Sequence, residues 1–353
     1  MPGPTRSPAP RSSAPSRRSV LRWGLGASAV LAVAGCGSVR VGQPAAYTPP
    51  PLGIDDLYRA DLLELLDRLL EATAGGADPR EEIAGRVREL HAALVEHRDA
   101  LLTGAEAQKE QDASSAGHGA SDGGGAEAQP VDAAGIVDLL GQMIALGADA
   151  CVQCSGSLAR VIAAIVSHLQ WAAGTLVLAA GDAALAAPAP PGEDALVPTR
   201  EVPTSDPPSV AATVDYEAAL QEAQGDEWYA GYAFEVMAAR ATDAAARTPL
   251  LDTSGLHRDR ARRLARIAEE DQITDVPQEA VYPLPGGGLD AATLEELPAG
   301  IGQGLLEDWV AMVGAVPFAR RAFAVATALA EAHGLVGAVS AIPVLPSLSA
   351  DDR

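Results

Sequence analysis

SLARVIAAIVSHLQWAAGTLVLAA, at residues 157–180, decides the fold class of this chain. Apolar residues recur through it at the three- and four-residue spacing of an α-helix, over a length that could cross a membrane. Arg160, His168 and Gln170 interrupt the stretch, and each of these side chains is costly in lipid. We therefore predict the buried helix of a helical bundle, with a membrane span as the alternative.

The segments on either side show the same spacing. In the segments before the stretch, this spacing predicts two helices that pack as a hairpin and a third helix at about 132–150. Their apolar positions are Leu62, Leu65, Leu66 and Leu69, then Ile83, Val87, Leu90 and Leu94, then Ile136, Leu140 and Met143. After the stretch, helices are predicted at about 215–246, 257–270 and 291–313, with a fourth that begins at Pro317. No segment alternates with period two, so the predicted fold is all-α, with two antiparallel four-helix bundles.

Stretches without apolar spacing divide the chain into domains. Residues 1–36 are a predicted signal and 37–53 a Pro-rich tether. Residues 186–209 carry seven prolines, which favours a stiff linker over a helix or a central strand. The predicted domains are an N-terminal bundle at 54–185, with a disordered loop at 104–129, and a C-terminal bundle at 210–342, followed by a tail at 343–353.

The N-terminus has the features of an export signal. Arg17 and Arg18 precede a short apolar run that ends in small residues before Cys36. This pattern resembles a bacterial lipoprotein signal of the twin-arginine type. The resemblance implies cleavage before Cys36, acylation of its sulfur, and an extracytoplasmic protein anchored to the cell membrane. The alternative is an ordinary signal with an incidental cysteine.

Net charge limits the partners. The chain carries a formal charge of -22, and the predicted signal contains arginines but no acidic residue, so the mature chain is more acidic still. Such a surface repels phosphate backbones and anionic lipid headgroups. We therefore expect no nucleic-acid partner, and membrane attachment only through acyl chains on Cys36.

Three short motifs in the second half resemble a known family. They are EAQGDEWYAGY at residues 222–232, HRDRARRL at 257–264 and LEDW at 306–309. Over residues 210–342 they resemble an exported bacterial family of ferritin-like domains of unknown function. The resemblance implies an antiparallel four-helix bundle and no particular activity. It aligns Glu227, His257 and Glu307 with the polar positions of the family.

The sequence gives little support to a metal centre in this bundle. A dinuclear carboxylate site needs Glu-x-x-His on each of two helices, because that spacing directs both ligands inward, and the chain contains no Glu-x-x-His. We therefore expect Glu227, His257 and Glu307 to form a hydrogen-bonded polar cluster or to be exposed, without a cofactor. The alternative is a degenerate metal site. The remaining acidic residues of these helices are expected on the solvated face: Glu222, Glu235 and Glu331.

The N-terminal bundle holds a second set of polar side chains. His97 lies on an apolar stripe and His168 inside the buried stretch, so a cluster with Cys151 and Cys154 is sterically conceivable and would suit zinc or copper. The simpler expectation for His97 is a hydrogen-bonded core histidine. Cys151 and Cys154 are compatible with a local disulfide, two inert thiols or a redox motif. Ser155 is expected to begin a turn that caps the fourth helix.

Motifs of common enzyme classes do not occur in the sequence. There is no phosphate-binding loop, no Gly-x-Ser-x-Gly and no His-Glu-x-x-His. We therefore predict a lipid-anchored extracytoplasmic helical protein with a non-catalytic role, in envelope assembly or in binding an unknown envelope protein or small ligand. The alternative is a metal-binding or redox protein. A solute-binding lipoprotein is disfavoured because such proteins usually build α/β lobes.

Overall fold

The computed structural model describes residues 53–74, 80–116, 132–200, 212–285 and 291–348. Within these ranges the regular structure is helical, apart from an isolated bridge between Val336 and Val339, which confirms the predicted all-α class. The predicted signal, with Arg17, Arg18 and Cys36, lies outside the described residues, as does the tether up to residue 52.

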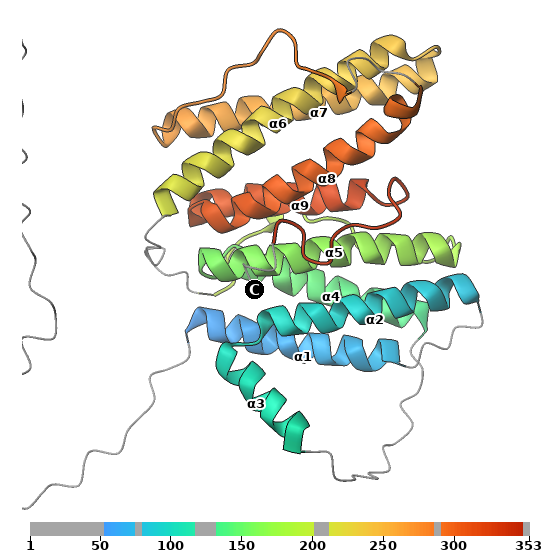
Figure 1. Ribbon diagram of the computed structural model, residues 1–353, viewed down its shortest axis with the longest axis vertical. Helices are drawn as coiled ribbons and strands as arrows, with labels where there is room; N and C mark the ends of the chain where they lie inside the picture. The colour runs from blue at the N-terminus through green and yellow to red at the C-terminus, as the bar shows by residue number, and fades with distance from the viewer. Residues whose placement is uncertain (1–52, 75–79, 117–131, 201–211, 286–290, 349–353) are drawn as a thin grey trace, which may run out of the picture. The chain divides into compact units, whose positions relative to one another are not determined.

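The first half of the described chain contains five helices (Figure 1). They are α1 (Ile54–Ala74), α2 (Glu81–Leu101), α3 (Gly104–Ala116), α4 (Ala133–Cys151) and α5 (Gly156–Ala180). The predicted stripes face the core: Leu62, Leu66 and Leu69 of α1 are fully buried. Helix α4 begins where Asp132 Oδ1 accepts a hydrogen bond from the Gly135 N–H at 2.9 Å.

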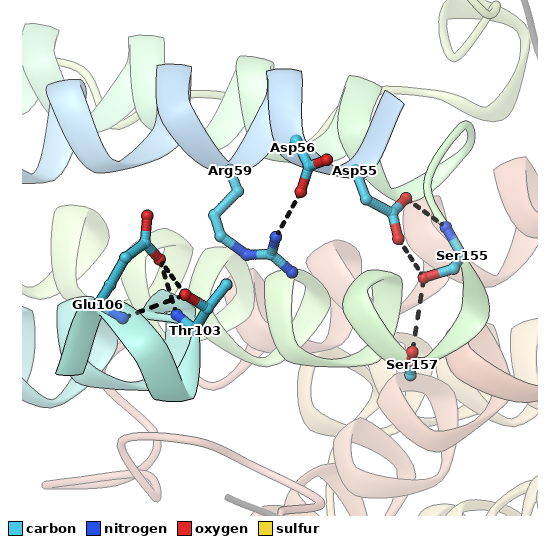
Figure 2. Close-up of polar contacts among 7 residues, drawn as sticks. All are labelled: Asp55, Asp56, Arg59, Thr103, Glu106, Ser155 and Ser157. Carbon is cyan, nitrogen blue, oxygen red and sulfur yellow. Dashed lines mark hydrogen bonds and ion pairs between the residues drawn. The ribbon is translucent and has the colours of Figure 1, made fainter. Parts of the chain in front are cut away.

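Helix α3 differs from the expectation of a disordered loop at 104–129. Residues 104–116 are helical, whereas 117–131 lie outside the described residues. A capping box begins the helix: Glu106 Oε2 accepts from the Thr103 N–H and hydroxyl at 2.8 and 2.7 Å, as Figure 2 shows. Glu110 also pairs with Arg98 of α2 at 2.7 Å. The sequence pattern did not indicate α3 because this helix has no apolar stripe.

Ser155 is the N-cap residue of α5, as expected, but its hydroxyl does not bond the helix's own backbone. Instead, Asp55 of α1 accepts hydrogen bonds from the Ser155 N–H at 2.8 Å and from its hydroxyl at 2.5 Å (Figure 2). The start of α5 is therefore attached to the start of α1.

The second half of the described chain contains four helices: α6 (Ala212–Arg240), α7 (Ala244–Glu270), α8 (Ala291–Ala315) and α9 (Phe318–Gly334). Helix α7 begins well before the predicted start at residue 257 and includes Pro249. Its N-cap is Asp243, whose side chain accepts from the Ala246 N–H at 2.7 Å. This cap ends α6 earlier than predicted, because the chain must leave helical geometry at an N-cap.

Helix α5 is the central element of the packing. It contacts α2 and α4 on one side and α8 and α9 on the other. Figure 1 shows α5 between these two pairs of helices. By length and composition α4 and α5 could each cross a membrane, but 83% of the apolar window of α5 is buried within the protein, against 50% in α4. A buried core helix accounts for this coverage of α5.

Small residues allow α5 and α8 to come close together. A Cβ atom added at Gly156 would overlap the carbonyl oxygen of Gly314, and one added at Gly314 would lie 2.7 Å from Arg160 Cβ. The buried apolar side chains of the described helices form one continuous cluster. Because α5 contacts helices of both halves, the division into two bundles, one of them ferritin-like, stays a prediction.

The described part of the predicted linker is attached to helices of both halves. Gln170 of α5 donates to the Pro188 carbonyl at 2.7 Å, and Arg263 of α7 binds both oxygens of Glu193, in the short 3-10 helix η2 (Glu193–Ala195), at 2.6 and 2.5 Å. Arg200 pairs with Asp61 of α1 at 2.6 Å. Residues 186–200 therefore run along the helices rather than apart from them.

Candidate functional site

A buried carboxylate lies where α6, α7 and α8 meet. Glu227 of α6 is fully buried, and its Oε2 bonds His257 Nδ1 of α7 at 2.7 Å. Its Oε1 accepts from Trp309 Nε1 of α8 at 2.8 Å and lies 3.5 Å from Arg260 Nη1 of α7. Both oxygens of the carboxylate are therefore engaged by donors, as a buried charge requires.

The surrounding side chains extend this network to the fourth helix. Arg260 also forms an ion pair with Glu331 of α9, whose side chain is only 12% exposed. The His257 ring stacks on Phe234, with centroids 5.4 Å apart and an interplanar angle of 14°. We define Glu227, His257, Arg260, Trp309 and Glu331 as the Glu227 network; it joins all four helices of the second half.

The structure brings together only part of the set predicted from the sequence. Glu227 and His257 meet, but Glu307 is exposed and does not join them. Trp309 lies in the network instead, because residues two positions apart on a helix are about 200° apart around its axis. Glu331, expected on the solvated face, is largely buried. Arg260, three residues after His257, follows a helical spacing that could have indicated it.

Acidic side chains gather on the α6 and α8 surfaces near Glu307. Burial raises the pKa of Asp308 to about 8, and the neighbouring carboxyls of Asp226, Glu222 and Glu307 add to the shift. Asp308 Oδ2 has no hydrogen-bond partner in the described part of the chain. A hydrogen bond between Asp308 and Asp226 adds to the same shift, so the folded protein holds a proton at this carboxyl pair that the unfolded chain releases at much lower pH.

We expect this proton to make stability fall as pH rises. The pKa of Asp308 is about 8 in the folded protein, above its ordinary value of 3.8. The contribution of Asp308 to the free energy of unfolding is therefore fully present below about pH 4 and is lost as pH increases through 8. Asp308→Asn is expected to stabilise the protein by about 1–2 kcal/mol at pH 8.5, a value reduced for solvent screening, and by much less at pH 5. Thermal unfolding at both pH values measures this, with the exposed Asp252→Asn as control; an equal effect at both values would contradict it.

His97 and His168 form a buried pair between α2 and α5. Their ring centroids are 5.0 Å apart at an interplanar angle of 74°. His97 Nε2 donates to the Val344 carbonyl at 2.9 Å. Burial lowers the pKa of His97 to about 4, a shift that the Val344 hydrogen bond opposes, and it lowers the pKa of His168 to about 3, a shift to which His97 adds. Both rings are therefore neutral near pH 7.

A small pocket of about 40 Å³ adjoins His168, between α2 and α5. Its lining includes His168, Trp171 and Thr175 of α5, and Arg86 and Glu89 of α2, which form an ion pair with each other at 2.9 Å. Such a volume holds a few water molecules or a small ion. The sequence pattern indicated His168 but not Trp171, whose indole gave no polar signal.

Cys151 and Cys154 are both free and buried. Cys151 Sγ contacts the Ala159 carbonyl at 3.5 Å. Burial raises the pKa of Cys151 to about 12, and burial together with Asp55 raises that of Cys154 well above its usual range. Reactive cysteines have lowered pKa values, so in this structure the two side chains have the character of inert thiols.

Among the residues that the structure describes, no group of three or more His, Cys, Asp or Glu side chains could hold a metal ion, so His97 and His168 do not combine with the cysteines into such a set. No protein-family model, curated protein or solved structure matches the chain. The resemblance of residues 210–342 to ferritin-like domains therefore stays a proposal.

Proposed function

We propose that this chain is a lipid-anchored extracytoplasmic helical protein with a non-catalytic role in binding or assembly at the cell envelope. The observation that supports a non-catalytic role for the second half is that the Glu227 carboxylate is held by hydrogen bonds from neighbouring helices. Both of its oxygens accept donors from neighbouring helices at 2.7 and 2.8 Å, which suits a structural role.

The charges around Glu227 support the same proposal. A metal ion bound by this carboxylate would have to displace the Trp309 N–H and approach the Arg260 guanidinium, 3.5 Å from Oε1. A second cation at that position costs Coulomb energy in a buried environment. The arrangement therefore favours a structural role, in which the network connects the helices, and disfavours an ion site.

Anchoring is tested by changing the predicted acylation site. In cells that carry the full chain, Cys36→Ser is expected to move the protein from the membrane fraction to the soluble extracytoplasmic fraction and to abolish incorporation of labelled fatty acid, because one or two acyl chains supply the membrane affinity. Ser38→Ala, two residues away, is the matched control and should stay in the membrane. A Cys36→Ser protein that remains there after a high-salt wash would contradict the proposal.

The export route is tested in the same cells. Changing Arg17 and Arg18 together to lysine is expected to leave the uncleaved precursor in the cytoplasm, because a twin-arginine signal is read through this pair. Normal export of that variant would contradict this route while leaving anchoring through Cys36 open.

A degenerate ferritin-like metal site is the second candidate, favoured by the contact of Glu227 with His257 in the core. Elemental analysis of protein purified without metal-affinity steps separates the two. Stoichiometric iron, manganese or zinc that is lost in Glu227→Gln would support the metal site and contradict the structural role of this residue.

A further inference from the structure

The last described residues, 341–348, lie against helices of both halves. We call them the 341–348 segment; they follow α9 and contain no helix. Three of the segment's backbone carbonyls accept hydrogen bonds from side chains of three helices: Gln303 of α8 donates to Ala341 at 3.2 Å, His97 of α2 to Val344 at 2.9 Å, and Arg160 of α5 to Ser347. The side chains of Ile342 and Leu345 are buried. The segment therefore connects α2, in the first half, to α8 in the second.

The segment ends in a turn with a strained residue. The Leu348 N–H donates to the Leu345 carbonyl at 3.2 Å, with Pro346 and Ser347 at the central positions. Ser347 has a φ of 66°, in the left-handed region that glycine normally fills at this place in a turn. Two hydrogen bonds from Arg160, to the carbonyl and the hydroxyl of Ser347, hold it there. A non-glycine residue in that region costs free energy, so the strain favours release of the segment.

The His97 ring, which the segment contacts, is in a site that does not compensate a positive charge. The ring is fully buried and meets the His168 ring edge to face, with centroids 5.0 Å apart. The segment itself contains no titratable side chain. On the neighbouring helices, Arg86 and Glu89 line the pocket beside His168 and pair with each other, and Arg160 binds Ser347. Within the described chain, no carboxylate contributes to the pKa of either ring.

A proton on His97 would therefore be an unpaired buried charge, which is costly. Burial lowers the pKa of His97 from 6.5 to about 4, and the Val344 hydrogen bond opposes this shift without cancelling it. Release of the segment removes the Val344 carbonyl and opens the ring to water, which returns the pKa towards its ordinary value. The released form then binds the proton more tightly than the closed form. The closed form is thus favoured above about pH 6.5 and loses stability as pH falls from there towards 4.

We propose that the 341–348 segment is an acid-released strap. Near pH 7 it is closed and joins α2 to α8. As pH falls below about 6, protonation of His97 releases it and uncovers the apolar surface beneath Ile342 and Leu345. This proposal is independent of the anchoring through Cys36.

Hydrogen exchange, followed by mass spectrometry on the full chain, tests the release. Peptides from residues 335–348 are compared at pH 5.0 and 7.0, with peptides from residues 220–234 of α6 as the internal reference. Each rate is divided by the rate of the same peptide in the unfolded chain at the same pH, because the chemical exchange step itself slows as pH falls. A pKa of 6.5 in the open form and about 4 in the closed form predicts that the corrected exchange of the segment is at least about 20-fold faster at pH 5.0. The α6 peptides should stay protected.

His97→Gln separates the proton from the packing. The glutamine amide can still donate to the Val344 carbonyl but does not titrate, so the corrected exchange of this variant is expected to differ by less than about threefold between the two pH values. His333→Gln, at an exposed histidine of α9, is the matched control and should keep the full acid response. If His97→Gln loses its helical circular dichroism, His97→Phe takes its place, because the ratio between the two pH values reports the proton and not the strength of the closed contact.

The proposal is overturned if the corrected exchange of the segment is the same at both pH values, or if the folded His97 variant keeps the acid response. It is also overturned if the α6 peptides open in parallel, because the whole protein would then respond to acid. Exchange of the segment at pH 7.0 as fast as in the unfolded chain would show that the strap is not closed, and would overturn it as well.

Discussion

Replacing Glu227 with alanine is expected to lower the free energy of unfolding by about 3–5 kcal/mol, the usual cost of breaking a buried ion pair from one side. The substitution leaves His257 Nδ1 and Trp309 Nε1 without their acceptor. It also removes one of the carboxylates that neutralise the buried Arg260. Denaturant unfolding followed by circular dichroism measures the change.

Two further variants show whether the Glu227 network causes this loss. Glu217→Ala, at an exposed position of the same helix, is expected to stay within about 0.5 kcal/mol of the unmodified protein. Glu227→Gln keeps the shape and one acceptor oxygen, so an intermediate loss is expected. If Glu227→Ala costs no more than Glu217→Ala, the carboxylate does not stabilise the helices and the proposed structural role fails.

Gly156→Ala is the second substitution with a large expected effect, a loss of about 3 kcal/mol. The new Cβ would overlap the Gly314 carbonyl oxygen, which belongs to backbone and cannot rotate away. Helix α5 would therefore have to move away from α8, and the apolar contacts between them would be lost. Thermal and denaturant unfolding both report the change.

Gly304→Ala is the control for this substitution. Gly304 also lies in α8, but nothing is within 4 Å of a Cβ added there. Alanine is favoured over glycine inside a helix by about 0.5–1 kcal/mol, so this variant should be slightly more stable. If Gly156→Ala and Gly304→Ala behave alike, α5 and α8 do not touch in solution, and the two predicted bundles are separate.

Helix positions were predictable wherever a helix buries an apolar stripe. The spacing of Leu62, Leu66 and Leu69 indicated α1 because those side chains all face the core. Helix α3 escaped prediction because none of its described side chains is buried, so the helix has no apolar stripe. The early start of α7 escaped as well, because the buried residues of this helix begin only at Ser254.

The candidate sites were predictable only in part. The family resemblance placed Glu227 beside His257, and those two side chains do meet. It also suggested Glu307, but the chain presents Trp309 on the inner face of α8. A hydrogen bond was expected for His97, yet its acceptor, the Val344 carbonyl, lies 247 residues away along the chain and no local pattern could identify it.

The amino-acid sequence by itself determined that this chain is helical and which faces of most helices are buried, because both follow from the spacing of apolar residues over a few turns. Only the tertiary structure decided which polar side chains share the interior. Those contacts, such as Trp309 with Glu227 or His97 with His168, depend on how helices distant in sequence rotate and approach one another. Their approach is set by packing at positions such as Gly156 and Gly314, where the absence of a side chain matters only once the partner helix is in place.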